Sequence, residues 1–112
     1  MSRVDSTLAA LADPSRRGVI DLLRRKPRRA GELAASLRMS GPAMSRHLRV
    51  LRRSGLVEEK HGGDDARVRV YRLRRAPFHD LRRWLEDVES FWAAELDSFK
   101  EYAERTHAKG RP

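Results

Sequence analysis

Between residues 41 and 53, the apolar positions follow the repeat of an α-helix. Met44, Leu48 and Leu51 are spaced at i, i+4 and i+7, so a helix places them on one side. At about 100° per residue, the opposite side carries a proline and three arginines, namely Pro42, Arg46, Arg49 and Arg53. The pattern predicts one face for a protein core and one for an anionic partner. A helix that enters the DNA major groove has this layout.

Two shorter helices are expected before residue 28. The first spans Thr7–Leu11, where the apolar residues cluster. Asp13 and Pro14 open the second, because Asp is a good N-cap and Pro fits the first helical position. Pro27 is expected to end this second helix, since a proline disfavours helical backbone in the residue before it.

A third helix over Ala30–Leu37 precedes the arginine-bearing one, and its Leu33 and Leu37 should point inward. Ser40 is expected to cap the next helix. Ser54-Gly55 should close that helix, because glycine is common just past a helix end. Two short helices joined by a tight turn form a helix-turn-helix.

Two strands should follow, Leu56–Lys60 and Arg67–Leu73, with a glycine-containing turn at 61–66. Arg67 and Arg69 share one strand face, and Tyr71 and Leu73 are in phase with them, while Val68 and Val70 share the other. We expect the base of this hairpin to pack on the protein and its tip to be free. A helix-turn-helix followed by a basic hairpin is a winged helix.

One long helix is expected from Pro77 to about His107, roughly 45 Å in length. Its apolar stripe is wider than one packing seam requires, and Trp84, Phe91 and Tyr102 widen one flank. A second copy of the chain is the simplest partner for this surface, and a monomer with an overhanging helix is the alternative. The expected dimer interface comprises Leu81, Leu85, Val88, Phe91, Trp92, Leu96 and Phe99.

The predicted fold is therefore mainly α with a small β-hairpin. A winged helix-turn-helix region should span residues 1–76, and a C-terminal dimerisation helix should span 77–108. Residues 109–112 are expected to be a disordered tail. Together these parts are expected to form one compact domain, as suits a chain of 112 residues.

The charge balance favours a nucleic-acid partner. Lys and Arg number 25 against 16 Asp and Glu, which gives a formal net charge of +9. Clustered arginine on a basic domain is the electrostatic footprint of a nucleic-acid binder, although a merely basic surface would give the same total.

Cysteine is absent, which excludes a disulfide framework and any thiolate metal site. No apolar run approaches the roughly 20 residues that cross a bilayer, and the first residues do not resemble a signal peptide. We therefore expect a cytoplasmic protein without a membrane partner.

Several short motifs resemble the ArsR/SmtB family of bacterial winged-helix repressors over residues 6–104. They occur in the family's order and spacing at Ala12–Arg16, Gly31–Ala34, Ser45–Leu51, Gly55–Val57 and Val70–Leu73. The resemblance implies a homodimer that binds a palindromic operator in double-stranded DNA, with repression relieved by an inducer. The aromatic-rich last helix looks like the branch of the family that does not sense metals, and the inducer is not identified.

The residues that could bind a metal ion are scattered along the chain. No two of His47, His61, His79 and His107 lie three or four residues apart, and Glu86, Glu89 and Glu95 have no histidine within a turn. We expect no metal site and no cofactor. A site built from His79, Asp80 and a partner chain stays open as the metal-responsive alternative.

The resemblance and the helical face together suggest roles for the DNA-binding residues. Arg46 is the candidate for base readout, since arginine paired with guanine is the commonest specific contact. Arg49 suits a base or a phosphate. Ser45 and His47 flank the reading face, although His47 could instead cap the helix bundle. Ser40 should cap the helix first and contact a phosphate second.

On the hairpin, Arg67 and Arg69 should reach phosphates or the minor groove. No glycine-rich phosphate loop, paired carboxylates or Ser-His-Asp set is evident, so an enzyme is not expected. Asp64 and Asp65, at the expected hairpin tip, are better explained as solvent-exposed charges than as groups for metal-assisted chemistry. The sequence predicts a DNA-binding transcriptional repressor, and a winged-helix module for RNA or protein binding is the alternative.

Overall fold

The computed structural model describes residues 2–61 and 67–109, with side chains as far as residue 106. It divides into two compact units between Leu81 and Arg82. The expected hairpin tip with Asp64 and Asp65, and the last three residues of the expected tail, lie outside the described residues.

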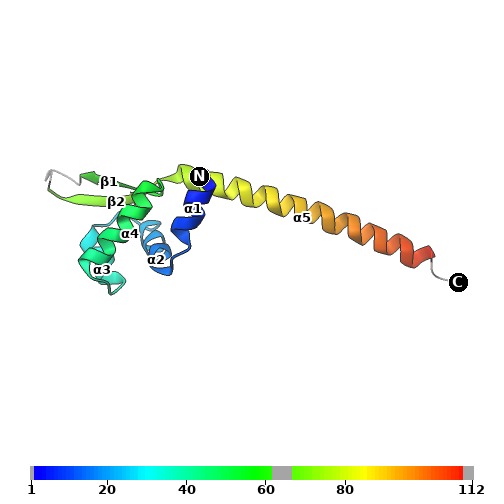
Figure 1. Ribbon diagram of the computed structural model, residues 1–112, viewed down its shortest axis with the longest axis horizontal. Helices are drawn as coiled ribbons and strands as arrows, with labels where there is room; N and C mark the ends of the chain where they lie inside the picture. Colours follow the sequence, from blue (N-terminus) through cyan, green and yellow to red (C-terminus); the bar gives the residue numbers. More distant parts are fainter. Residues whose placement is uncertain (1, 62–66, 110–112) are drawn as a thin grey trace. The chain divides into compact units, whose positions relative to one another are not determined.

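The first helix, α1 (Arg3–Leu11), begins four residues before the predicted start (Figure 1). A capping box explains the difference. The Ser2 hydroxyl accepts a hydrogen bond from the Asp5 N–H at 3.1 Å, and the Asp5 carboxylate accepts one from the Ser2 N–H at 3.4 Å. These two contacts satisfy amide groups that an uncapped helix end would leave without partners.

The N-cap predicted for α2 (Pro14–Leu23) is confirmed. The Asp13 carboxylate accepts hydrogen bonds from the N–H groups of Ser15 and Arg16 at 2.8 and 3.1 Å. These contacts favour the ionised form of the Asp13 carboxyl group. The hydrogen bond from the Arg16 N–H is the main cause that lowers the pKa of Asp13. The helix ends at Leu23, earlier than the predicted stop at Pro27.

The helix-turn-helix consists of α3 (Ala30–Ser36) and α4 (Gly41–Arg53). Arg38 turns the chain between them with a φ of 54°, a left-handed conformation that is uncommon for a residue other than glycine. The Ser40 hydroxyl caps α4 by accepting from the Ala43 N–H at 3.2 Å, as predicted. Gly55 follows the helix with a φ of 77°, which glycine adopts without strain.

The wing is an antiparallel pair of strands, β1 (Val57–His61) and β2 (Arg69–Leu73). Val57 lies opposite Leu73 and His61 opposite Arg69, so Arg69, Tyr71 and Leu73 share a face as predicted. β2 begins two residues later than expected, so Arg67 precedes the strand. Arg28 pairs with Tyr71 through two backbone hydrogen bonds, which ties the loop after α2 to the wing.

A single apolar core is shared by the four helices α1, α2, α3 and α4 and by the base of the wing. Its buried apolar residues are Ala10, Val19, Leu23, Leu33, Ala34, Met44, Leu48, Leu51, Leu56 and Val57. Burying each larger side chain contributes about 1.5–3 kcal/mol relative to leaving it exposed. The base of the hairpin packs on this core, as expected, through Val57 and Leu73.

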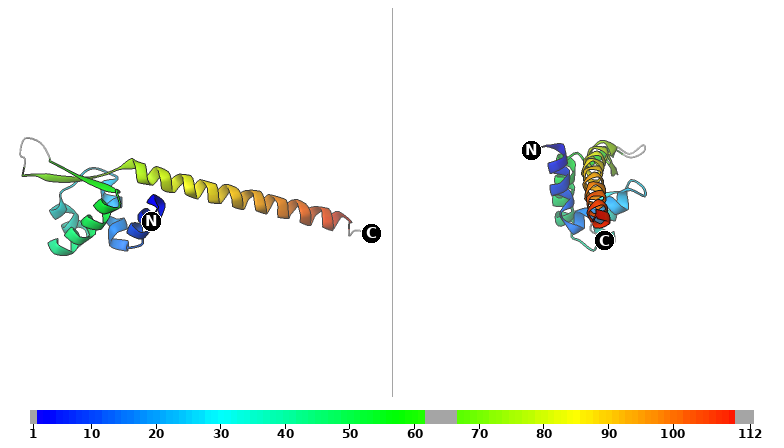
Figure 2. Two further views of the ribbon diagram at one scale, coloured as in Figure 1. Left: turned by 45° about the horizontal axis from the view of Figure 1, so that its top comes forward. Right: turned by 90° about the vertical axis from the view of Figure 1, so that its right-hand side faces the viewer.

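The last helix, α5 (Arg75–Lys109), runs without a break in the left view of Figure 2. Its first turns belong to the first unit. There Pro77 is buried, Phe78 packs against the core, and the Asp80 carboxylate lies 3.2 Å from the Arg3 guanidinium. Among residues 2–61 and 67–109, no helix is long and apolar enough to cross a membrane.

Candidate nucleic-acid interface

α4 separates an apolar face from a basic one, as its sequence predicts. Met44, Leu48 and Leu51 are buried in the core. The opposite side carries four exposed residues that we call the reading face, namely Pro42, Arg46, Arg49 and Arg53, and Ser45 on its flank is exposed as well. This helix therefore presents a solvent-facing basic surface on a buried apolar support.

The three arginines of the reading face have no interaction with other residues in the part of the chain that the structure describes. Among the residues that the structure describes, no hydrogen bond or ion pair joins the guanidinium group of Arg46, Arg49 or Arg53 to another group. Each guanidinium carries five donors in a planar fork that matches phosphate or guanine acceptors. Within the described residues, therefore, no ion pair has to break before these three arginines contact an anionic ligand.

The side chain of His47 lies beside Arg16 of α2. Its ring is half-buried, and its Nδ1 atom lies 3.4 Å from Nη1 of Arg16. A guanidinium has donors only, so Nδ1 accepts in this pair and Nε2–H is left as the donor of the ring. This placement favours the expected alternative in which His47 caps the helix bundle.

Arg16 is a residue that the sequence reasoning missed. Its Nε atom donates to the Ala10 carbonyl at 2.6 Å, its Nη2 atom lies 3.4 Å from the Ala9 carbonyl oxygen, and Nη1 lies 3.9 Å from the Asp13 carboxylate. It therefore links the end of α1, the start of α2 and His47 of α4. The pairing with His47 spans 31 positions of sequence, and no local pattern signals it.

The wing arginines differ in their surroundings. Arg69 is exposed, but its Nε atom lies 3.1 Å from the Glu59 carboxylate. Arg52, at the end of α4, approaches the same carboxylate at 2.9 Å, and the Tyr71 hydroxyl donates to it at 3.4 Å. Arg67 is exposed beside the undescribed tip and also interacts within the chain. Sequence reasoning missed Glu59 and Arg52.

Two titratable groups of the wing have shifted pKa values. Burial, followed by the nearby Glu59 charge, raises the pKa of Tyr71. On the other face of the hairpin, a hydrogen bond from Arg72 lowers the pKa of Glu58, and Lys60 lies 3.8 Å from the same carboxylate. In the described part of the hairpin, the Glu58 and Glu59 ion pairs thus lie on opposite faces.

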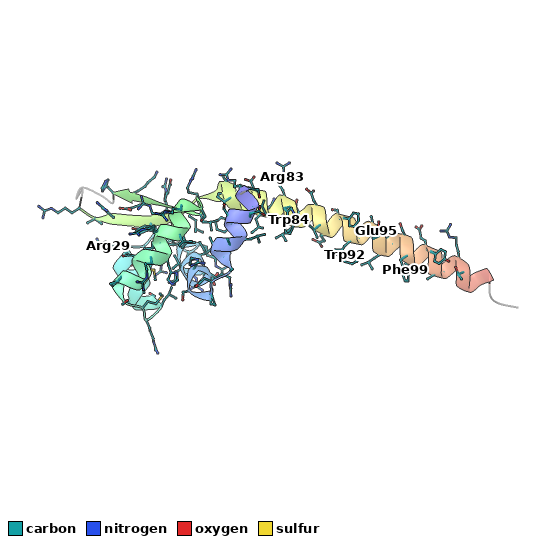
Figure 3. All side chains as sticks on the ribbon, viewed as in Figure 1. Arg29, Arg83, Trp84, Trp92, Glu95 and Phe99 are labelled. Atoms are coloured by element: carbon teal, nitrogen blue, oxygen red, sulfur yellow. The ribbon has the colours of Figure 1, made fainter. Side chains whose placement is uncertain are left out.

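The predicted dimer residues line the exposed length of α5. Leu81 is half-buried at the end of the first unit. The others are exposed, and Trp92 and Phe99 keep 60% and 69% of their surface accessible: Leu85, Val88, Phe91, Trp92, Leu96 and Phe99. Figure 3 shows the side chains of Trp84, Trp92 and Phe99 projecting from this helix.

No three metal-binding side chains gather anywhere in residues 2–61 and 67–106. His79 is exposed on α5, and Asp80 pairs with Arg3. Glu86 lies 3.3 Å from Arg82 on the same helix.

A helix-turn-helix with one face in the core, a basic exposed face on its second helix and a two-stranded wing define a winged helix-turn-helix DNA-binding protein. Residues 13–59 match the family model described as bacterial regulatory protein, arsR family. The chain is 37% identical over 95 residues to the HTH-type transcriptional regulator Rv2034 of Mycobacterium tuberculosis, which covers 85% of this chain and 83% of that protein. It belongs to the ArsR family of transcriptional regulators.

A second relative, the transcriptional repressor SdpR of Bacillus subtilis, is 27% identical over 82 residues, covering 73% of this chain and 88% of that protein. Among solved structures, an ArsR-like transcriptional regulator from Rhodococcus sp. RHA1 is 33% identical with a TM-score of 0.77, covering 90% of this chain and 92% of that one. A homodimeric winged helix-turn-helix domain from Mycobacterium bovis is 26% identical with a TM-score of 0.59, covering 86% and 83%. These likenesses confirm the predicted fold.

Proposed function

We propose that this regulator is a dimeric repressor that binds a palindromic operator through the reading face of α4 and the wing. The observation that carries the proposal is the set of three exposed arginines, Arg46, Arg49 and Arg53, which have no internal partner among the described residues and stand opposite a buried apolar face. Arg46 reads a base, Arg49 contacts a base or a phosphate, and Arg53 contacts the backbone.

The remaining candidate residues take supporting roles in this proposal. Ser40 caps α4 and lies at its N-terminus, where a phosphate is favoured. Pro42 and Ser45 border the groove. His47 orients α4 against Arg16 and leaves one ring donor, Nε2–H, for the DNA. Arg67 and Arg69 bring the wing to phosphates or the minor groove.

The apolar stripe of α5 forms the dimer interface. Exposed tryptophan and phenylalanine favour association, and a second copy supplies a matching surface. The Mycobacterium bovis relative is homodimeric, which supports the same state here. Two-fold symmetry would then place two α4 helices one DNA turn apart, roughly 34–36 Å. Repression is supported by the name of the Bacillus subtilis relative.

The test is selection of bound fragments from genomic DNA, followed by affinity measurements at several salt concentrations. We expect a palindrome to be recovered. If a dimer neutralises about six to ten phosphates, log K should fall against log salt with a slope of about −5 to −9. A flat salt response, or equal affinity for the recovered palindrome and random duplex, would contradict the proposal.

A further inference from the structure

Glu59 is a carboxylate held between cations from two elements of the proposed interface. One oxygen lies 2.9 Å from Nη1 of Arg52, in the last turn of α4, and the other lies 3.1 Å from Nε of Arg69 on β2. The Glu59 side chain is only 13% exposed, whereas those of Arg52 and Arg69 are 54% and 65% exposed. The carboxylate is therefore largely shielded from solvent, whereas the two arginines remain accessible.

The hairpin register explains why these groups meet. Glu59 lies opposite Tyr71, and His61, two residues further along β1, lies opposite Arg69. Residues two apart on a strand share a face, so Glu59, Tyr71 and Arg69 lie on one side of the hairpin. The Tyr71 hydroxyl adds a third contact to the carboxylate at 3.4 Å. Glu59 thus joins the end of α4 to both strands of the wing.

A carboxylate at this position works against affinity for a polyanion. Any phosphate that recruits Arg52 or Arg69 competes with Glu59 for the same guanidinium. The competition matters most where phosphate contacts are the main favourable term, which is the case in sequence-independent binding. On the operator, the base contacts of the reading face fix the register of the protein on the DNA, so the released arginines cannot gain new phosphates by a shift of the complex. On non-cognate DNA no base contact fixes the register, and such a shift is possible.

We propose that Glu59 is a specificity-determining residue of this regulator. It withholds Arg52 and Arg69 from the phosphates of non-cognate DNA, and it fixes the wing against α4 so that the two bind as one unit. The proposal rests on the function proposed above, because it presumes that α4 and the wing face DNA.

Glu59→Gln tests the proposal with little change in side-chain volume. Affinity is measured for the palindrome recovered by selection and for a random-sequence duplex of equal length. Releasing two arginines should raise affinity for the random duplex about threefold to tenfold, with a salt slope steeper by about 0.9 for each new phosphate contact. Affinity for the palindrome should change less than about twofold, so the specificity ratio falls.

Glu58→Gln is the matched control. It raises the net charge by the same amount, but it releases Arg72 and Lys60 on the other face of the hairpin. Its specificity ratio should stay within about twofold of wild type. An equal fall in the ratio for both variants would show that net charge alone matters, and it would overturn the proposal.

Arg52→Gln distinguishes the release of charge from a loosened wing. It breaks the contact between α4 and Glu59, as Glu59→Gln does, but it removes the arginine of α4 and does not free it. We expect the affinity of Arg52→Gln for the random duplex to be no higher than that of wild type, in contrast to the rise expected for Glu59→Gln. A rise in both variants would assign the effect to loosening and would overturn the proposal.

The two proposals fail in different ways. A wild-type protein that does not prefer the recovered palindrome contradicts the proposed function. A wild-type protein that prefers it, with an unchanged ratio in a folded Glu59→Gln variant, contradicts only the role of Glu59.

Discussion

Arg46 projects from the exposed side of α4, and its guanidinium has no partner among the described residues. Because a bidentate contact to guanine is sequence-specific, Arg46→Ala should cost about 1–3 kcal/mol of operator affinity. The loss should be confined to one base position in each half-site. The measurement is a panel of operators with single-base changes, on which the variant should no longer distinguish bases at that position.

Arg67 provides the contrast at the same scale. A phosphate contact carries no sequence information, so Arg67→Ala should weaken binding to all sequences alike and make the salt slope shallower by about 1 for each half-site. If the two variants lose affinity in the same pattern across the panel, the division between base and phosphate contacts is wrong.

Individual residues were predictable only where a local pattern identifies them. The spacing of Met44, Leu48 and Leu51 was sufficient to place the reading face, because helical geometry fixes the opposite side. The Arg16–His47 pair and the contacts of Glu59 depend on how separate elements pack. In the sequence, Glu59 is one charge among several on a polar strand, and nothing there distinguishes it from Glu58.

At the scale of helices and strands, caps were better predictors than prolines. Asp13 and Ser40 begin their helices as expected, because their side chains satisfy free amide groups. Ser2 and Asp5 form a capping box that the sequence contained and the apolar pattern missed, since only part of α1 is apolar. The helix α2 ends at Leu23, before Pro27, and Arg28 then pairs with Tyr71, a contact that the local sequence does not reveal.

The N-cap of α2 makes a testable contribution to acid stability. The pKa of Asp13 is lowered in the folded protein, mainly by the hydrogen bond from the Arg16 N–H. Its stabilisation is therefore present above the ordinary pKa of 3.8 and is lost as the pH falls through the lowered value. Asp13→Asn keeps a good N-cap but cannot titrate. The free energy of urea unfolding should fall less for the variant than for wild type across this acidic window. If it depends on pH in the same way for both proteins, Asp13 does not make this contribution.

For the whole molecule, the most consequential expectation is assembly through α5. Trp92→Glu would bury a charge in the proposed apolar interface, and an unpaired buried charge is strongly destabilising. Light scattering after gel filtration should give twice the chain mass for wild type and a shift toward monomer for the variant. Ser90→Glu is the control, because position 90 lies off the apolar stripe by helical geometry, and this variant should remain dimeric. A monomeric wild type at tens of micromolar would contradict the interface.

Metal response is a second property of the whole molecule. Zn²⁺ requires about three or four converging ligands, and the chain has no cysteine and widely spaced histidines. Operator affinity with excess chelator and with added Zn²⁺, Ni²⁺ or Co²⁺ should agree within about twofold, or ~0.4 kcal/mol. A loss of about tenfold on metal addition, abolished by His79→Ala, would identify a metal-responsive repressor with a site shared between copies.

Both tryptophans of the chain, Trp84 and Trp92, belong to α5, and each is exposed. Intrinsic tryptophan emission therefore originates entirely outside the helix-turn-helix and the wing. A blue shift of that emission on raising the protein concentration would report burial of this helix by a second copy, without any label. DNA can be added in the same titration, and a change in emission would then report an effect that reaches α5. The sequence thus provides an optical probe for assembly that is separate from the groups that contact DNA.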